Sequence, residues 1–213
     1  MTQAPSLSAK QAAIAPIAAF TATGDLGRLV DALNIGLDAG LSVNEVKEIL
    51  VQLYAYAGFP RSLNALGQLM KVIDGRKARG IHDVPGREVS VDIPTGDALL
   101  AAGTATQTKL AGAPVKGELF DFAPAIDLYL KTHLFGDVFA RDNLDWQSRE
   151  LATVGALAAL SGVEPQLQVH IRISLNVGLS VAQLRQLARA LDEQGDGSAA
   201  ARLLLTLDGQ SQR

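Results

Sequence analysis

Glu150 and His170 are the two residues whose types and spacing could do chemistry together. One predicted helix ends and the next begins near Gly162, twelve residues after the glutamate and eight before the histidine. At a rise of about 1.5 Å per helical residue, the two residues lie roughly 18 and 12 Å from that turn. Antiparallel helices would leave them about 6 Å apart along the axis, within reach of both side chains. A carboxylate beside an imidazole favours its charged form and suits proton transfer near neutral pH.

A purely structural role for His170 fits the same residues. Its helix has an inward stripe with i, i+3, i+4, i+7 spacing, formed by Leu167, His170, Ile171 and Ser174. In such a stripe the imidazole can pack in the core with one ring nitrogen on a backbone carbonyl. Glu150 would then only favour the N-terminus of its own helix. The residues by themselves leave both interpretations open.

The composition narrows the possible chemistry. The chain has 213 residues, is 48% hydrophobic and carries a formal net charge of −3, with scattered basic residues. This argues against a nucleic-acid partner, which requires a concentrated basic face. There is no cysteine, which excludes disulfides, thiol nucleophiles and thiolate metal ligands. The three histidines are far apart in sequence and show no metal-ligand spacing, so neither a metal nor another cofactor is expected.

The chain shows no signal for a membrane or for export. No apolar run approaches the roughly 18 residues that a membrane span requires. The N-terminal sequence MTQAPSLSAK has no apolar core of the kind found in signal peptides. We therefore expect a cytoplasmic protein without a membrane partner.

The elements that must position the pair have a helical period, and we expect an all-α fold. One helix should begin at Ser42, with Glu45 completing a capping box, and its apolar stripe is Val46, Ile49, Leu50 and Leu53. Pro60 should open the next helix, with an apolar face at Leu63, Leu66, Met70 and Ile73. Further helices are expected at 97–110, 124–134 and 145–160. A short strand is expected at 88–93, where apolar and polar residues alternate.

An internal repeat predicts two related helical units. Residues 37–43 read LDAGLSV and residues 175–181 read LNVGLSV, an offset of 178 − 40 = 138. Neither copy buries its apolar face well alone, so the two should pack as a helical bundle about a pseudo-twofold axis. We expect a first helical unit at 1–75 with a degenerate site, a connector with one helix at 76–118, and a second helical unit at 119–213 that carries the candidate site.

The two copies differ at the reactive positions. The offset places Ala12 opposite Glu150 and Ala32 opposite His170, so the pair exists in the second copy alone. The first copy brings aromatic residues instead, namely Tyr54, Tyr56 and Phe59. We therefore expect the second copy to supply the reactive groups and the first copy to supply aromatic side chains that enclose them.

The segments that hold these residues resemble a known family. The stretch RELATVGALAALSGVEPQLQVHIRISLNVGLS, and EVKEILVQLYAYAGFPRSLNALG in the first half, resemble the carboxymuconolactone decarboxylase family. The chain is similar to the members that contain two related units. The resemblance implies an all-α fold built on a helical hairpin, like that of alkyl hydroperoxidase D, and assembly into a dimer, trimer or hexamer.

The resemblance implies two kinds of activity, of which one is excluded here. The alkyl hydroperoxidase branch uses a CxxC pair before the histidine, where this chain has Val163 and Gln166. Cysteine peroxidase chemistry is therefore excluded, whatever a family label suggests. The other branch removes carbon dioxide from a carboxylated muconolactone in aromatic catabolism. It needs no cofactor in principle, because the unsaturated lactone takes up the electrons that are left behind.

By this resemblance Glu150 and His170 match the charged pair of the family and are the expected catalytic residues. The expected substrate-binding residues are Arg149, Arg172, Tyr56 and His133, and an arginine suits a carboxylate. Solvated helix faces for the arginines, a core position for the tyrosine and a surface position for His133 stay open. We expect a lyase acting on a small carboxylated lactone or related organic acid. The alternative is a non-catalytic member that binds a small molecule or a protein partner through the same cavity.

Overall fold

The computed structural model describes residues 6–210, and all regular elements in that range are helices. The first half contains α1 (Ala9–Ala12), α2 (Ile14–Thr23), α3 (Leu26–Asp38), α4 (Val43–Gln52), α5 (Tyr54–Ala57) and α6 (Phe59–Ala78). The second half contains α7 (Gly96–Ala111), α8 (Glu118–Phe122), α9 (Pro124–Tyr129), the π-helix η1 (Leu130–Val138), α10 (Trp146–Ala159), α11 (Glu164–Asn176), α12 (Val181–Glu193) and α13 (Gly197–Gln210). The expected all-α fold is confirmed. None of the described helices is both long and apolar enough to cross a membrane.

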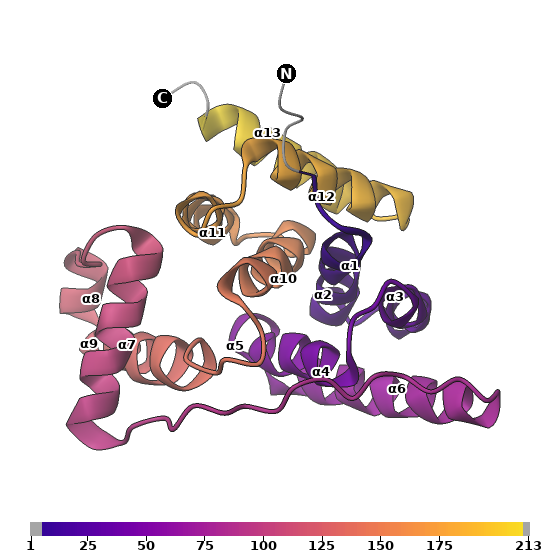
Figure 1. Cartoon of the computed structure of the whole chain (residues 1–213). Coiled ribbons are helices and arrows are strands. Elements are labelled where there is room, and N and C mark those ends of the chain that lie inside the picture. The colour runs from indigo at the N-terminus through magenta and orange to yellow at the C-terminus, as the bar shows by residue number, and fades with distance from the viewer. Residues whose placement is uncertain (1–5, 211–213) are drawn as a thin grey trace.

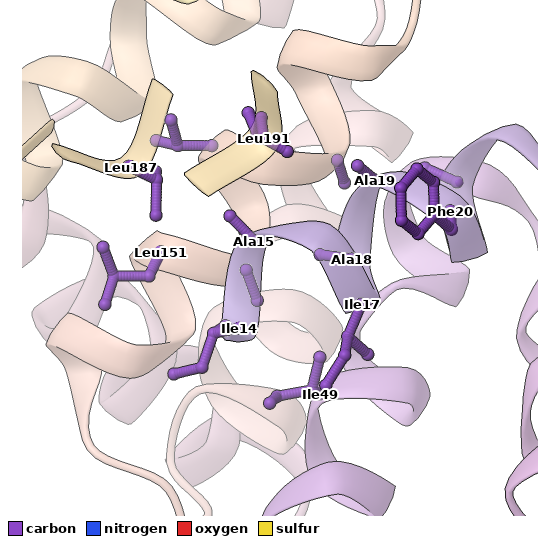
Figure 2. Packing of buried hydrophobic residues seen from close by; sticks show 14 of the residues in the cluster. Ile14, Ala15, Ile17, Ala18, Ala19, Phe20, Ile49, Leu151, Leu187 and Leu191 are labelled. Atoms are coloured by element: carbon purple, nitrogen blue, oxygen red, sulfur yellow. The ribbon is translucent and has the colours of Figure 1, made fainter. Parts of the chain in front are cut away.

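The core is centred on α2 and α10, which pack side by side in the middle of the molecule (Figure 1). Gly155 of α10 makes this packing close, since a Cβ atom there would lie 2.8 Å from the Cα and carbonyl oxygen of Ala15. Apolar side chains of α2 meet those of α4, α10 and α12 around this contact, as Figure 2 shows for Ile14, Ile49 and Leu187. The predicted buried helix at 145–160 is therefore confirmed.

The helices that follow Ser42 and Pro60 form as expected, but half of the face predicted for the second is wrong, since Leu66 and Ile73 pack against the core and Leu63 and Met70 do not. Ser42 and Glu45 form the capping box, and the apolar stripe of α4 is buried. In α6, however, Leu63 is 62% exposed and Met70 is 67% exposed. The buried residues of α6 are Ser62, Ala65, Leu69, Val72 and Arg76. Small side chains let α6 approach its neighbours, and the hydroxyl of Ser62 donates to the carbonyl of Leu50 at 2.8 Å.

The segment between α6 and α7 contains no strand, so the prediction of a strand at 88–93 is wrong. α6 continues to Ala78, and the chain then runs without regular structure toward α7, along the bottom of the view in Figure 1. The backbone N–H groups of Val43 and Asn44 donate to the carbonyls of Val84 and Pro85, both at 2.9 Å. No second strand lies beside this segment in the described structure, so part of its backbone pairs with the N-terminus of α4 instead.

The helices predicted at 97–110 and 124–134 form, and the second is longer than expected. α9 passes into η1 at Leu130, and the helix ends at Val138. α7 packs against η1 at Gly103, where a Cβ atom would lie 1.7 Å from the carbonyl oxygen of Lys131. The last part of the predicted connector is therefore packed against the second half of the chain.

The bounds of several helices follow the offset of 138 residues. α3 and α11 each have 13 residues and begin at Leu26 and Glu164, which are 138 positions apart. α4 and α12 begin at Val43 and Val181, again 138 apart, and each follows a serine capping box. These shared features support the proposal of two related units.

Candidate functional site

The side chains of Glu150 and His170 meet in the structure. Nδ1–H of the imidazole donates to Oε2 of the carboxylate at 2.8 Å, because a carboxylate can only accept. Glu150 is 0% exposed and His170 is 8% exposed. The bond fixes the tautomer of a neutral His170, so that Nε2 is left to accept or, when protonated, to donate. Nε2 has no hydrogen-bond partner among residues 6–210.

Two short structural signals place the pair. Asp145 caps α10 by accepting the backbone N–H of Ser148 at 2.8 Å, which fixes where that helix starts. Gly162 has a φ of 80° and turns the chain back toward α11. The antiparallel hairpin then brings positions 150 and 170 to the same level, as the sequence spacing predicts.

Tyr56 of α5 covers the imidazole from the other half of the chain. Its ring lies edge-on to that of His170, with 5.6 Å between the ring centroids and an interplanar angle of 80°. Burial raises the pKa of Tyr56, and the negative charge of Glu150 raises it further. The phenol therefore stays neutral and is a hydrogen-bond donor across the physiological range of pH.

Two buried polar atoms at or near the pair have no hydrogen-bond partner among the described residues. They are Oε1 of Glu150 and Oγ of Ser174, which lies one turn beyond His170 on α11. Buried polar groups are nearly always hydrogen-bonded, so such atoms require an explanation. They are groups to which a bound molecule could hydrogen-bond.

The pair is nearly closed to solvent within one chain. Five hollows along residues 6–210 are lined by other side chains, and none of these five includes Glu150 or His170. Access to the imidazole runs through the small exposed part of His170. No three histidine, aspartate or glutamate side chains of the described residues converge where they could hold a metal ion.

Arg149 lies in a different polar cluster, although it precedes Glu150 in the sequence. Its guanidinium is fully buried, with Nη2 donating to Oε1 of Glu48 at 2.9 Å and to the carbonyl of Arg141 at 2.8 Å. Nη1 donates to Gln52 at 3.1 Å. Burial lowers the pKa of Arg149, and the charge of Glu48 opposes this. Burial also tends to raise the pKa of Glu48, but Arg141, Arg149 and Asn143 outweigh it and hold that pKa below its usual value.

This placement gives no support to Arg149 as a substrate-binding residue. Both Nη groups of Arg149 donate hydrogen bonds to Glu48, Gln52 and Arg141, and none of these three was an expected site residue. Glu48 lies 101 residues away in the chain. No local pattern marks Glu48, because at 100° per residue it lies on the side of α4 opposite the apolar stripe of Val46 and Ile49.

Two of the other expected substrate-binding residues, Arg172 and His133, lie on the surface. Arg172 is exposed on α11 and makes no ion pair with the described residues. His133 lies on η1, where Nδ1 is 2.8 Å from Oδ2 of Asp137, and half of its side chain is exposed. Its ring is tilted against Tyr54 at 5.5 Å. Of the four expected binding residues, Tyr56 is the one that the structure places against His170.

Comparison with known protein families gives a match in the second half of the chain. The sequence model of the carboxymuconolactone decarboxylase family matches residues 124–208, from the start of α9 into α13. The matched segment contains both Glu150 and His170. No curated protein matches the chain.

Proposed function

We propose that the chain is a cofactor-independent lyase, on the premise that residues 124–208 match the sequence model of the carboxymuconolactone decarboxylase family. Its substrate would be a small carboxylated lactone or a related organic acid. The observation that carries the proposal is the buried hydrogen bond of 2.8 Å between His170 and Glu150, with Nε2 of the imidazole unpartnered. Positioned acids and bases of this kind contribute roughly 10²–10⁴-fold to a reaction rate.

His170 would act as the proton donor to carbon. The bond between the lactone carbon and the carboxylate breaks, carbon dioxide leaves, and the electron pair passes into the conjugated carbonyl. Protonated His170 then delivers the proton from Nε2 to the substrate carbon, and solvent restores it. Glu150 holds the ring by Nδ1 and stabilises the imidazolium before transfer. The neutral phenol of Tyr56 is a candidate donor to oxygen as negative charge develops there.

The substrate carboxylate needs a cation, and neither expected arginine lies beside His170 on its own helix face. Arg149 is fully buried and bound to Glu48, and Arg172 is exposed two residues after His170, about 200° away around α11. An arginine that only binds the carboxylate should raise KM when it is replaced and leave kcat nearly unchanged.

The direct test is turnover of a carboxymuconolactone, followed as carbon dioxide release. We expect His170→Gln and Glu150→Gln to lose turnover, while His82→Gln, which alters an exposed histidine with no expected role in the site, keeps it. Circular dichroism establishes that each variant is folded. Turnover by His170→Gln at the rate of the wild type would contradict the proposal.

A non-catalytic binding protein is the second candidate, and the near-closure of the site favours it. Only 8% of His170 is exposed, and the described hollows lie elsewhere. In this case no lactone is turned over, but an organic acid that binds the native state still raises the melting temperature. Turnover by the wild type decides between the two candidates.

The homo-oligomer that the resemblance implies is part of this proposal. α8 and α9 expose Leu119, Phe122 and Tyr129, and exposed apolar patches often mark association surfaces. Sedimentation of the purified chain measures the number of subunits directly.

A further inference from the structure

A hollow between the first helices of the chain and the end of α12 lies at the repeat-related counterpart of the His170–Glu150 pair. Its lining residues are Ala9, Ala12, Ala13, Pro16, Ala32, Ile35, Ala39, Ala190, Glu193 and Gln194. The offset of 138 relates Ala12 to Glu150 and Ala32 to His170. It also relates Gln194, at the end of α12, to Tyr56. The hollow therefore contains the counterparts of all three residues that meet at the pair.

The residue types at these positions explain why a hollow is present. A carboxylate and an imidazole fill the space between α10 and α11, where they bond to each other at 2.8 Å. In the first half, methyl groups stand at both positions, on α1 and α3. The helices keep corresponding bounds, so the shorter side chains leave a space of about 240 Å³.

We propose that this hollow is a second binding site, for a small uncharged apolar molecule about the size of one ring. Its lining is mostly alanine methyl groups with Pro16 and Ile35, and none of the lining residues is a cation. Glu193 is the ionisable lining residue, and its negative charge disfavours an anionic ligand. An apolar cavity of about 150 Å³ is enough to hold benzene, and drug-sized molecules need upwards of about 300 Å³. A volume of 240 Å³ lies between these limits.

This site differs in chemistry from the His170–Glu150 pair. It has no residue that could transfer a proton to a ligand near neutral pH other than Glu193, whose side chain is exposed. Gln194 is half-buried and offers one amide to a ligand carbonyl or hydroxyl group. The proposal is independent of the activity proposed for the second half of the chain.

The test is titration of the full chain with toluene, followed by the NMR signals of alanine methyl groups. We expect saturable shifts for the methyl groups of Ala12, Ala32 and Ala190. Benzoate, which has the same ring with a negative charge, should bind at least about tenfold more weakly, because burying an unpaired charge is costly. Equal binding of benzoate would overturn the ligand class that we propose.

A matched pair of variants on α12 locates the binding. Ala190→Leu puts a larger side chain into the hollow and should abolish the toluene shifts. Ala182→Leu adds the same group on the same helix at an exposed position that does not line the hollow, and should leave them unchanged. If Ala190→Leu does not fold, Ala12→Leu at the half-exposed end of α1 replaces it.

Two results would overturn the proposal. One is that toluene causes no saturable shifts, or that the shifts persist when the hollow is filled in a folded variant, Ala190→Leu or its replacement Ala12→Leu. The other is a change of the same methyl signals with protein concentration and without toluene, which would show that a second copy of the chain occupies the hollow.

Discussion

Glu48 of α4 lies 2.9 Å from Arg149 of α10, and both side chains are buried. Arg141 adds a second ion pair to the same carboxylate, at 2.7 Å. These ion pairs join the two halves of the chain through charged groups that folding has removed from solvent. Because each charge depends on the other, the removal of one partner leaves an uncompensated charge in the core.

Glu48→Gln should therefore destabilise the protein by about 3 kcal/mol at neutral pH, since two arginines lose their counter-charge. Urea denaturation measures the loss. Glu118→Gln, on the exposed surface of α8, is the control and should change the free energy of unfolding by less than about 0.5 kcal/mol. A cost as small as that of the control would mean that the buried pair contributes nothing to stability.

The same glutamate should make stability sensitive to acid. The pKa of Glu48 is held below its usual value of 4.5 in the native state, so the unfolded state binds more protons over that interval. Its contribution is fully present above pH 4.5 and is lost as the pH falls through the lower native pKa. We expect the stability difference between wild type and Glu48→Gln to shrink on acidification below that pH. A difference that is constant from neutral pH downward would contradict this.

The two histidine–carboxylate pairs should differ in their effect on stability. His170→Ala leaves the buried carboxylate of Glu150 with neither oxygen bonded to a described residue, and we expect a cost of roughly 3 kcal/mol. His133→Ala breaks an exposed pair with Asp137 and should cost no more than about 1 kcal/mol. Chemical denaturation of both variants gives the comparison. Equal costs would mean that Glu150 finds another partner when the imidazole is absent.

Gly155→Ala should destabilise the centre of the fold. The new methyl group would meet the backbone of Ala15 at 2.8 Å, and overpacking of this kind costs about 1–3 kcal/mol. Gly67→Ala in α6 meets nothing within 4 Å and should stabilise the protein by about 0.5–1 kcal/mol through helix propensity. Thermal melting of the two variants should shift in opposite directions. A Gly155→Ala variant as stable as wild type would show that α2 and α10 can separate at little cost.

The relation between the two units can be tested by rebuilding the pair in the first one. Ala12→Glu and Ala32→His should each destabilise the protein, because each places one polar group in an apolar hollow. If the two units are related, the double variant should recover about 1–3 kcal/mol relative to the sum of the single changes. It should also lose the binding of toluene. Strict additivity would mean that the two positions do not face each other as Glu150 and His170 do.

The sequence by itself determined the features that depend on local spacing. The capping box at Ser42 and the buried stripe of α4 follow from residues within a few turns of one another. The contact between Glu150 and His170 was also predictable, because a tight turn at Gly162 fixes the register of two antiparallel helices. The offset of 138 residues between the two repeats identified Ala12 and Ala32 as the positions in the first half that correspond to Glu150 and His170.

Tertiary structure decided what depends on partners distant in the chain. Arg149 bonds to Glu48, because α4 packs beside α10 and supplies a carboxylate from 101 positions away. Leu63 and Met70 are exposed because the neighbours of α6 cover the face of Ala65, Leu69 and Val72 instead, and a lone helix with apolar residues on two sides does not specify which side is covered. The segment at 88–93 forms no strand, because a strand needs a second one beside it and the described fold is entirely helical. The spacing of residues along the sequence determines which of them share a helix face. Only tertiary packing determines which other element, if any, covers that face.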